Sequence, residues 1–528
     1  MKIDQMINDT GGESELQLQQ YAEEFNTQYV NSVSDDMLDP ALVSKLPVEW
    51  ARNNKLLPVV VSGEICVLTS DPDQVDEQEH LSILIGEDLK PIFANDRVIA
   101  DAIDRCYYSK DDSPEEFIQD LGEGDSVGVE VKADDLFLVA DKAPVTQLVN
   151  LILLEAVKKK ASDVHFEPYE SNLRVRYRVD GVLYEQASPP KHLEEALVSR
   201  IKVMAHMDIA ERRLPQDGMA KVSVGGRQID LRVSTVPVAE GERVVLRILD
   251  KDSTLLPLEV LGMESDNLDV FRSLLREPNG IIIVSGPTGS GKTTTLYAAL
   301  GEIDSSRKNI MTIENPIEYQ LDNIGQIQVK PKIDLTFAAG LRHILRQDPD
   351  VILVGETRDM ETADIAIRAS LTGHLVFTTL HTNDAPGAVL RLLDMGVEPY
   401  LLASCLRGVL AQRLVRKLCA ECKKEITITA DMISGIEEAG KAIVGKKAWE
   451  PVGCDSCLEG YSGRVGMFEL MMVDNGMQEL MRSGSLNAAE LRASAESVGM
   501  TSLVKDGLSK VVNGTTSISE FENAAFQH

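Results

Sequence analysis

A glycine-rich octapeptide in the middle of the chain has the residue types and the spacing that bind nucleotide phosphates. It consists of Gly286, Pro287, Thr288, Gly289, Ser290, Gly291, Lys292 and Thr293 and matches G-x-x-x-x-G-K-[ST] in full. Glycines let the backbone wrap a phosphate, and the N–H groups at the start of the following helix attract anions. Lys292 can contact the β/γ-phosphates, the Thr293 hydroxyl can bind Mg²⁺, and Thr294 joins the same nucleotide-binding set. The sequence therefore predicts a P-loop that binds ATP with Mg²⁺.

Two apolar strands end in glutamates that could handle the metal ion and the attacking water. Val351–Val354 is followed by Gly355 and Glu356, the arrangement of a Walker B element, and we predict that Glu356 orients or activates water. Glu314 follows the strand at 310–313 and could reach the metal or the water. A surface carboxylate or a polar loop would explain either position without catalysis.

Histidines and arginines supply candidate groups for stabilising phosphate charge. His374 and His381 bracket the apolar strand 375–378, and a histidine beside a phosphate site can donate a hydrogen bond to developing negative charge, although a lone histidine is more often structural. ATPases that work as rings use arginines from a neighbouring domain or subunit to sense the γ-phosphate. Arginines that could do so alternate with apolar residues on predicted strands before the P-loop: Arg174, Arg176, Arg178, Arg227, Arg232, Arg243 and Arg247. We predict phosphate-sensing roles within this group, with surface ion pairs as the alternative for any one member.

Four cysteines form two CxxC pairs. Cys419 and Cys422 are separated by 31 residues from Cys454 and Cys457. Four thiolates in two such knuckles predict a closed, structural, tetrahedral Zn²⁺ site. Disulfides, which the cytosol disfavours, and an iron–sulfur cluster are the alternatives. Because the insertion is longer than in a usual zinc ribbon, we expect a helical excursion between the pairs.

The elements that must position these residues predict an α/β fold of several domains. Short apolar strands alternate with helices around the P-loop, as in a parallel sheet that is covered on both faces. A helix at Leu16–Phe25 and a hairpin around Gly63 belong to a first small domain. The domain boundaries we predict are 1–108, an acidic linker at 109–142, an arginine-bearing domain at 143–252, and an ATPase domain at 255–528, which includes the tetracysteine subdomain at 415–460 and C-terminal helices at 485–528.

Charge and hydropathy narrow the class of protein. The net charge is −31, and residues 1–140 hold 9 Lys and Arg against 31 Asp and Glu. Such a chain repels nucleic-acid phosphates, which argues against the nucleic-acid motor that zinc knuckles alone would suggest. The acidic stretches are either solvated surface or a docking surface for a basic partner. No apolar run approaches the roughly 20 residues of a membrane span, and the N-terminus has no signal-peptide pattern, so we expect a cytoplasmic protein.

These residues together resemble the secretion and pilus-assembly ATPases, and most closely the type II secretion ATPases. The similarity covers roughly residues 143–528 and rests on the motifs at 162–168, 178–181, 215–218, 286–293, 314–319, 345–350, 355–356 and 373–383 and on the tetracysteine. Residues 396–399 and 408–414 favour the secretion branch over pilus extension. The motif residues of the family correspond here to Glu314 and Glu318, His374 and His381, and the helical arginines Arg342 and Arg346. The resemblance implies phosphate sensing by Arg342, Arg346 and His374.

The resemblance implies a homo-hexameric ATPase at the cytoplasmic face of the inner membrane. It implies a RecA-like core and a PAS-like second domain. The motor would push pseudopilin subunits through a polytopic inner-membrane platform protein, and a bitopic inner-membrane protein would recruit it through the docking domain at 1–108. Nucleic acid is not an expected partner.

Three residues depart from the pattern of the family. Asn315 stands where an aspartate is usual, Met219 where an arginine commonly follows Gln-Asp-Gly, and Thr357 where an aliphatic residue follows Glu356. Lys292 and Thr293 are retained, so we expect ATP hydrolysis. A type IV pilus extension ATPase and a weakly hydrolysing, nucleotide-gated scaffold are the alternatives.

Overall fold

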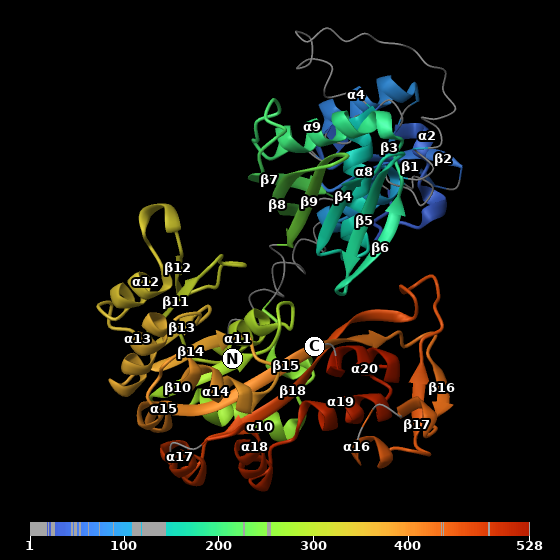
Figure 1. Ribbon diagram of the computed structural model, residues 1–528. Coiled ribbons are helices and arrows are strands. Elements are labelled where there is room, and N and C mark those ends of the chain that lie inside the picture. The colour runs from blue at the N-terminus through green and yellow to red at the C-terminus, as the bar shows by residue number, and fades with distance from the viewer. Residues whose placement is uncertain are drawn as a thin grey trace. The chain divides into compact units, whose positions relative to one another are not determined.

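The computed structural model (Figure 1) describes most of the chain. It covers residues 27–43, 54–61, 63–72, 74–87, 89–107, 144–224, 227–250, 255–433, 438–483 and 486–526, with single positions at Leu18, Tyr21, Ala22, Leu46, Trp50, Ala51, Pro114, Ile118 and Ile436. The predicted helix at Leu16–Phe25 and the predicted linker at 109–142 lie almost wholly outside these residues. The chain forms two compact units, Met1–Asp250 and Lys251–His528.

A small α/β module comes first in the first unit. Its elements are η1 (Asp35–Met37), α2 (Pro40–Val43), β1 (Leu57–Val61), β2 (Glu64–Thr69), α4 (Val75–Ile85), β3 (Lys90–Phe93) and α5 (Asp96–Tyr107). β1 and β2 are antiparallel and β3 is parallel to β2, which confirms the hairpin predicted around Gly63, where φ is +84°. Ile99 and Ile103 of α5 share one buried cluster with Val59 and Val67 of the sheet.

A six-stranded antiparallel sheet follows in the same unit. Its elements are α8 (Pro144–Lys158), β4 (Asp163–Pro168), β5 (Leu173–Val179), β6 (Val182–Ala187), η2 (Lys191–Leu193), α9 (Glu194–Met204), β7 (Gln216–Val224), β8 (Arg227–Val238) and β9 (Gly241–Asp250), in the sheet order β6-β5-β4-β9-β8-β7. Residues alternate between buried and half-buried along β5. Its Tyr177 hydroxyl donates to the Ile152 carbonyl oxygen at 2.7 Å, so α8 covers the apolar face and the arginines of β5 lie on the other face.

The second unit is built on a seven-stranded sheet in the order β12-β11-β13-β14-β10-β15-β18. Its strands are β10 (Gly280–Ser285), β11 (Ile310–Glu314), β12 (Gly325–Gln328), β13 (Val351–Val354), β14 (Leu375–Leu380), β15 (Leu406–Leu418) and β18 (Tyr461–Met472). All neighbours are parallel except β15 and β18. The parallel arrangement predicted from the short apolar strands is confirmed, whereas the long β15–β18 pair was not predicted.

Helices cover both faces of this sheet, which explains why its central strands β10, β13 and β14 are buried at every position. They are η3 (Leu258–Leu261), α10 (Ser265–Leu275), α11 (Lys292–Gly301), η4 (Pro331–Ile333), α12 (Phe337–Ile344), α13 (Met360–Leu371), α14 (Ala385–Asp394) and α15 (Pro399–Cys405). Ile282 and Val284 of β10 are buried against α10 and α11. Ile281 and Ile283 point the other way, into the cluster that contains α12 to α15. Alternate residues of one strand therefore serve two separate cores.

The described segment between the cysteine pairs combines a two-stranded antiparallel sheet with two short helical turns, so the predicted helical excursion is confirmed only in part. β16 (Lys424–Thr427) pairs with β17 (Lys447–Glu450), and only η5 (Asp431–Ile433) and the four-residue α16 (Glu438–Lys441) are helical. The alternating sequence Lys-Glu-Ile-Thr-Ile-Thr favours a strand, whose Ile428 is buried with Ile433 and Ala448.

Four helices end the described chain: α17 (Asn475–Arg482), α18 (Ala488–Ser497), α19 (Leu503–Val512) and α20 (Ile518–Phe526). Figure 1 shows α19 and α20 beside β15 and β18, with β16 and β17 at that end of the unit. The tail was predicted as mostly helical, and its described residues contain three of these helices. Among the described residues, no helix is long and apolar enough to cross a membrane.

Candidate ATPase site

The P-loop joins β10 to α11 and is fixed from the side by β15. Gly286 has φ +151°, and a Cβ there would lie 2.4 Å from the Gln412 carbonyl oxygen. Gly291, with φ +88°, is the N-cap of α11. The Gln412 side-chain amide donates to the Ser290 carbonyl oxygen at 2.8 Å. These positions need glycine for both space and backbone conformation, so the motif and the local fold require the same residues.

Lys292 turns back over the loop that precedes it. Its Nζ donates to the carbonyl oxygens of Gly286 at 2.7 Å and Pro287 at 2.9 Å. Burial lowers the pKa of Lys292 to about 8, while the nearby Glu356 acts in the opposite direction. The ammonium group therefore lies against the loop whose amides attract phosphate, beside a carboxylate.

Glu356 and His381 follow the ends of adjacent parallel strands, β13 and β14. The Glu356 carboxylate is 12% exposed, forms an ion pair with Arg358 Nε at 2.6 Å and lies 3.8 Å from His381 Nε2. Burial, and next the charge of Lys292, lower the pKa of His381, and Glu356 opposes this shift. The structure thus brings together three predicted residues, Lys292, Glu356 and His381. The cluster combines a phosphate-binding cation with a carboxylate and a neutral imidazole that can order water.

Glu314 takes a different position from the one predicted. Its carboxylate is buried and accepts hydrogen bonds from Tyr297 Oη at 2.5 Å, Thr312 Oγ1 at 2.5 Å and Gln326 Nε2 at 3.2 Å. Burial, and then Glu314, raise the pKa of Tyr297. The carboxylate is occupied by side-chain donors in the protein interior, so this geometry does not offer it to a metal ion or to water. In this position Glu314 links α11 to the β11–β12 edge, and its predicted role beside the metal ion or the water stays a prediction.

His374 lies at the wrong end of its strand for contact with the P-loop of the same chain. Its carbonyl oxygen accepts from Gly280 N at 3.1 Å, at the start of β10, and its Nδ1 bonds to the Ala369 carbonyl oxygen at 2.8 Å. The P-loop follows the other end of β10, about 20 Å away for a six-residue strand. The spacing of the two histidines placed them on one strand, but parallel pairing puts only His381 at the phosphate edge.

Of the two helical arginines, Arg342 lies on the surface of α12 and Arg346 follows the end of that helix. Arg342 pairs with Glu361 of α13 at 2.6 Å. Arg346 donates to the Arg342 carbonyl oxygen at 2.9 Å, and its other terminal nitrogen lies 2.5 Å from His343 Nδ1. Both guanidinium groups are engaged locally, and their predicted phosphate-sensing role stays a prediction.

The arginine face of the first unit is organised by two carboxylates on β4. Glu167, which is 3% exposed, pairs with Arg243 at 2.6 Å and Arg176 at 2.8 Å. Asp163 pairs with Arg247 at 2.8 Å and Arg178 at 3.7 Å. We did not single out either carboxylate from the sequence, although the alternation in Asp-Val-His-Phe-Glu places both on one face of a strand.

Of the other three predicted arginines of this unit, Arg174 of β5 pairs with Glu185 at 3.3 Å and two lie on β8. Arg232 is opposite Met219 on β7 and Arg247 on β9. Arg227 begins β8, and its side chain lies outside the described residues. Their predicted roles are neither supported nor contradicted by these positions.

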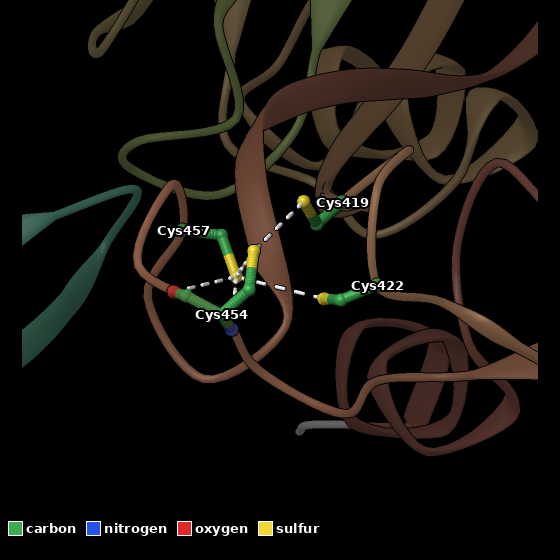
Figure 2. Close-up of side chains that lie close together, drawn as sticks. All are labelled: Cys419, Cys422, Cys454 and Cys457. Atoms are coloured by element: carbon green, nitrogen blue, oxygen red, sulfur yellow. Dashed lines mark hydrogen bonds between the residues drawn. The ribbon is translucent and has the colours of Figure 1, made fainter.

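The four CxxC cysteines converge where β15 ends and β18 begins (Figure 2). Their Sγ atoms all lie within 4.8 Å of one another, with separations of 3.8 Å for Cys419–Cys454, 3.7 Å for Cys422–Cys457 and 3.6 Å for Cys454–Cys457. A tetrahedron of thiolates with metal–sulfur bonds of ~2.3 Å has edges of about 3.8 Å. A disulfide would need ~2.05 Å, and all four thiols are free, so the donor set fits a metal ion.

Comparisons with known proteins agree with this site. A family model described as Type II/IV secretion system protein matches residues 139–523, and a MshEN domain model matches residues 29–113. The type II secretion system ATPase E of Vibrio cholerae is 53% identical over 396 residues, which cover 73% of this chain and 76% of the relative. The type IV pilus assembly ATPase PilB of Myxococcus xanthus is 44% identical over 497 residues, which cover 93% of this chain and 87% of PilB.

A solved structure supports the fold. The ATPase DotB of Yersinia pseudotuberculosis superposes with a TM-score of 0.54 at 21% identity, over 72% of this chain and 93% of DotB. At 21% identity, this structural similarity supports the fold and carries no information on function. The family model, which spans well over half of the chain, carries the assignment together with the P-loop cluster. The chain therefore belongs to the Type II/IV secretion system protein family and is an ATPase of that family.

Proposed function

We propose that this chain is the cytoplasmic ATPase motor of type II protein secretion, which drives pseudopilus assembly through an inner-membrane platform protein. The observation that carries the proposal is the cluster of Lys292, Glu356 and His381 at the ends of β10, β13 and β14. The identity of 53% to a type II secretion ATPase over the core supports the secretion branch.

The residues of the cluster divide the work of hydrolysis. Lys292 binds the β/γ-phosphates, and Gly286 to Thr294 enclose them. Thr293 would hold Mg²⁺, which neutralises phosphate charge when bound. Glu356 orients or activates the attacking water, and His381 donates a hydrogen bond to developing negative charge. Arg227, Arg232 and Arg243 remain our proposed phosphate sensors, with Arg342 and Arg346.

The tetracysteine cluster would hold a structural Zn²⁺. The sulfur separations fit four thiolates on one ion and leave no ligand position open for catalysis. An iron–sulfur cluster would need room for several irons within the same cage and is the less fitting occupant. Metal analysis of the purified chain should give one zinc per chain, and the double variant Cys454→Ser/Cys457→Ser should lose it. Iron with inorganic sulfide in the wild-type protein would overturn the zinc assignment.

The assembly we propose is a homo-hexamer at the cytoplasmic face of the inner membrane. The N-terminal domain, 1–108, would bind a bitopic membrane protein, and the acidic linker at 109–142 would connect it to the domains at 143–252 and 255–528. The acidity of the N-terminal region supports a basic docking partner, because residues 1–140 hold most of the negative charge of the chain. Membership of the Type II/IV secretion system protein family supports this location.

A type IV pilus extension ATPase is the second candidate. The length of the aligned region favours this candidate, since the similarity to PilB extends over 93% of this chain, including the N-terminal region. Complementation separates the two functions. Expression of the chain in a strain that lacks its own gene should restore secretion of exoproteins and leave piliation unchanged. Restored piliation without secretion would replace our proposal with the second candidate.

The enzymatic part of the proposal is tested by Lys292→Ala. The wild-type protein should hydrolyse ATP with Mg²⁺ and faster as the oligomer forms, and the variant should lose hydrolysis while keeping its circular dichroism spectrum. The matched control is Lys332→Ala, which removes an exposed lysine of the same unit. Hydrolysis that survives Lys292→Ala would contradict the assigned site.

A further inference from the structure

Three buried threonines lie between the ends of β13 and β14, next to the catalytic cluster. Thr357, Thr378 and Thr379 are 5%, 1% and 4% exposed. A buried hydroxyl needs a hydrogen-bond partner, because losing water without replacement is costly. Thr378 and Thr379 belong to β14, and Thr357 directly follows Glu356. The hydrogen bonds of these three hydroxyls therefore determine how the end of β13 is joined to β14.

The hydrogen bonds of these threonines anchor the backbone on both sides of Glu356. Before it, the Gly355 carbonyl oxygen accepts from Thr379 Oγ1 at 2.6 Å. After it, Thr357 N donates to the Thr379 carbonyl oxygen at 3.0 Å, and the Thr357 and Thr378 hydroxyl oxygens are 2.7 Å apart. Only the last contact depends on the side chain of residue 357, because a residue of any type except proline supplies the backbone N–H.

A second hydroxyl contact holds the other side of His381. Thr382 Oγ1 lies 2.6 Å from Ser285 Oγ, and Thr382 N donates to the same Ser285 oxygen at 3.1 Å. Ser285 is the last residue of β10 and directly precedes Gly286 of the P-loop. Two hydroxyl pairs therefore lie at these strand ends, Thr357–Thr378 on the side of Glu356 and Ser285–Thr382 on the side of His381.

We propose that Thr357 is a positioning residue for ATP hydrolysis, whose hydroxyl, bonded to Thr378, sets the spacing between Glu356 and His381. This inference rests on the proposed ATPase function. The two catalytic groups lie 3.8 Å apart on different strands, and the pairing of β13 with β14 ends at Val354 and Thr378, before either group. Beyond that point the threonine contacts replace the sheet ladder. A catalytic group that shifts by a fraction of an ångström loses rate without losing substrate affinity.

The test compares valine and serine at position 357. Thr357→Val keeps the shape and removes the hydroxyl, and we expect kcat for ATP hydrolysis to fall by about five-fold, with KM for ATP changed by less than about two-fold, as for one hydrogen bond of ~1 kcal/mol. Thr357→Ser restores the hydroxyl and should recover most of kcat. Thr378→Val removes the other half of the same contact, so it should reproduce the loss, and the double valine variant should be no slower than either single one.

A matched control exists in the next helix. Thr362 of α13 is 1% exposed, like Thr378, but its hydroxyl has no hydrogen-bond partner among the described residues. Thr362→Val should leave kcat and KM unchanged. Wild-type kcat in both Thr357→Val and Thr378→Val, or an equal loss in Thr362→Val, would overturn the positioning role. The proposed ATPase function fails separately, if the wild-type protein does not hydrolyse ATP or if Lys292→Ala still does.

Discussion

Two regions of the molecule place a glutamate between an arginine and a histidine, and they differ in where the trio lies on its sheet. Glu167 pairs with Arg243 and lies 3.8 Å from His165 Nδ1, in the middle of a strand. Glu356 pairs with Arg358 and lies 3.8 Å from His381 Nε2, past the end of a strand. The first trio faces neighbouring strands, whereas the second faces the P-loop. We therefore expect position on the sheet, rather than composition of the trio, to decide which of the two trios acts directly in hydrolysis.

The sharpest test of this comparison is Glu356→Gln. The substitution keeps the size of the side chain and removes the group that orients water, so we expect kcat to fall by roughly 10²–10⁴-fold, as for loss of general base catalysis. ATP binding should be retained, because Lys292 and the loop are untouched. Single-turnover hydrolysis and the Kd for a fluorescent ATP analogue measure the two effects. A fall of less than about ten-fold would place the catalytic carboxylate elsewhere.

Glu314→Ala tests whether the buried Glu314 carboxylate contributes to stability rather than to catalysis. The hydroxyls of Tyr297 and Thr312 would lose a buried acceptor, so we expect the free energy of unfolding to fall by about 2–3 kcal/mol. Tyr297→Phe removes one donor and should cost about 1 kcal/mol. Chemical denaturation measures both. If Glu314→Ala stopped hydrolysis while leaving stability unchanged, Glu314 would return to the catalytic set.

The pH dependence of nucleotide binding tests the electrostatics of the P-loop edge. Burial lowers the pKa of Lys292 to about 8 in the nucleotide-free protein. Phosphate favours the charged ammonium, so binding above that pH requires uptake of a proton. The affinity for ATP should therefore be constant below about pH 8 and should fall as pH rises through it, by up to ~10-fold per unit. Calorimetric titration between pH 7 and 10 measures this, and Lys292→Arg, whose charge does not titrate, should flatten the profile.

The smallest effect is expected on the arginine face. Glu167→Gln removes the charge that holds Arg176 and Arg243, but these arginines are 27% and 40% exposed and water can replace part of the pairing. We expect a loss of about 1–2 kcal/mol in the free energy of unfolding and a change in kcat of less than about three-fold. A fall in kcat comparable to that of Glu356→Gln would show that both trios serve catalysis.

The sequence predicted the parts of the site that are local in the chain. The P-loop, the strand before Glu356 and the CxxC pairs are short motifs whose spacing alone specifies the backbone around them, as at Gly286 and Gly291. The order of the central strands could not be deduced in the same way, since β10 lies between β14 and β15, which follow it by many residues. Without that order, His374 and His381 looked equivalent.

The direction of a side chain at the end of a strand was the second feature that the sequence could not predict. Glu314 directly follows a four-residue run in which only Thr312 is polar, and Glu356 follows Val351–Val354 after Gly355, so the sequence places both glutamates at the end of a buried strand. The difference comes from Tyr297, Thr312 and Gln326, which surround one carboxylate and belong to three separate elements. The β-structure between the cysteine pairs was missed for a simpler reason, because the length of the insertion outweighed the alternating pattern of its residues.

Strand β15 joins two sites that sequence distance keeps apart. Gln412 in this strand holds the P-loop at Ser290, and seven residues later Cys419 enters the metal cage, about 23 Å along an extended chain. The strand is hydrogen-bonded to β10 on one side and β18 on the other. Because both of its edges are hydrogen-bonded, β15 is a rigid connection between the P-loop and the cysteine cluster. We expect a displacement of the phosphate loop to be passed along this strand to the cysteine cluster, which a bound metal ion would stiffen.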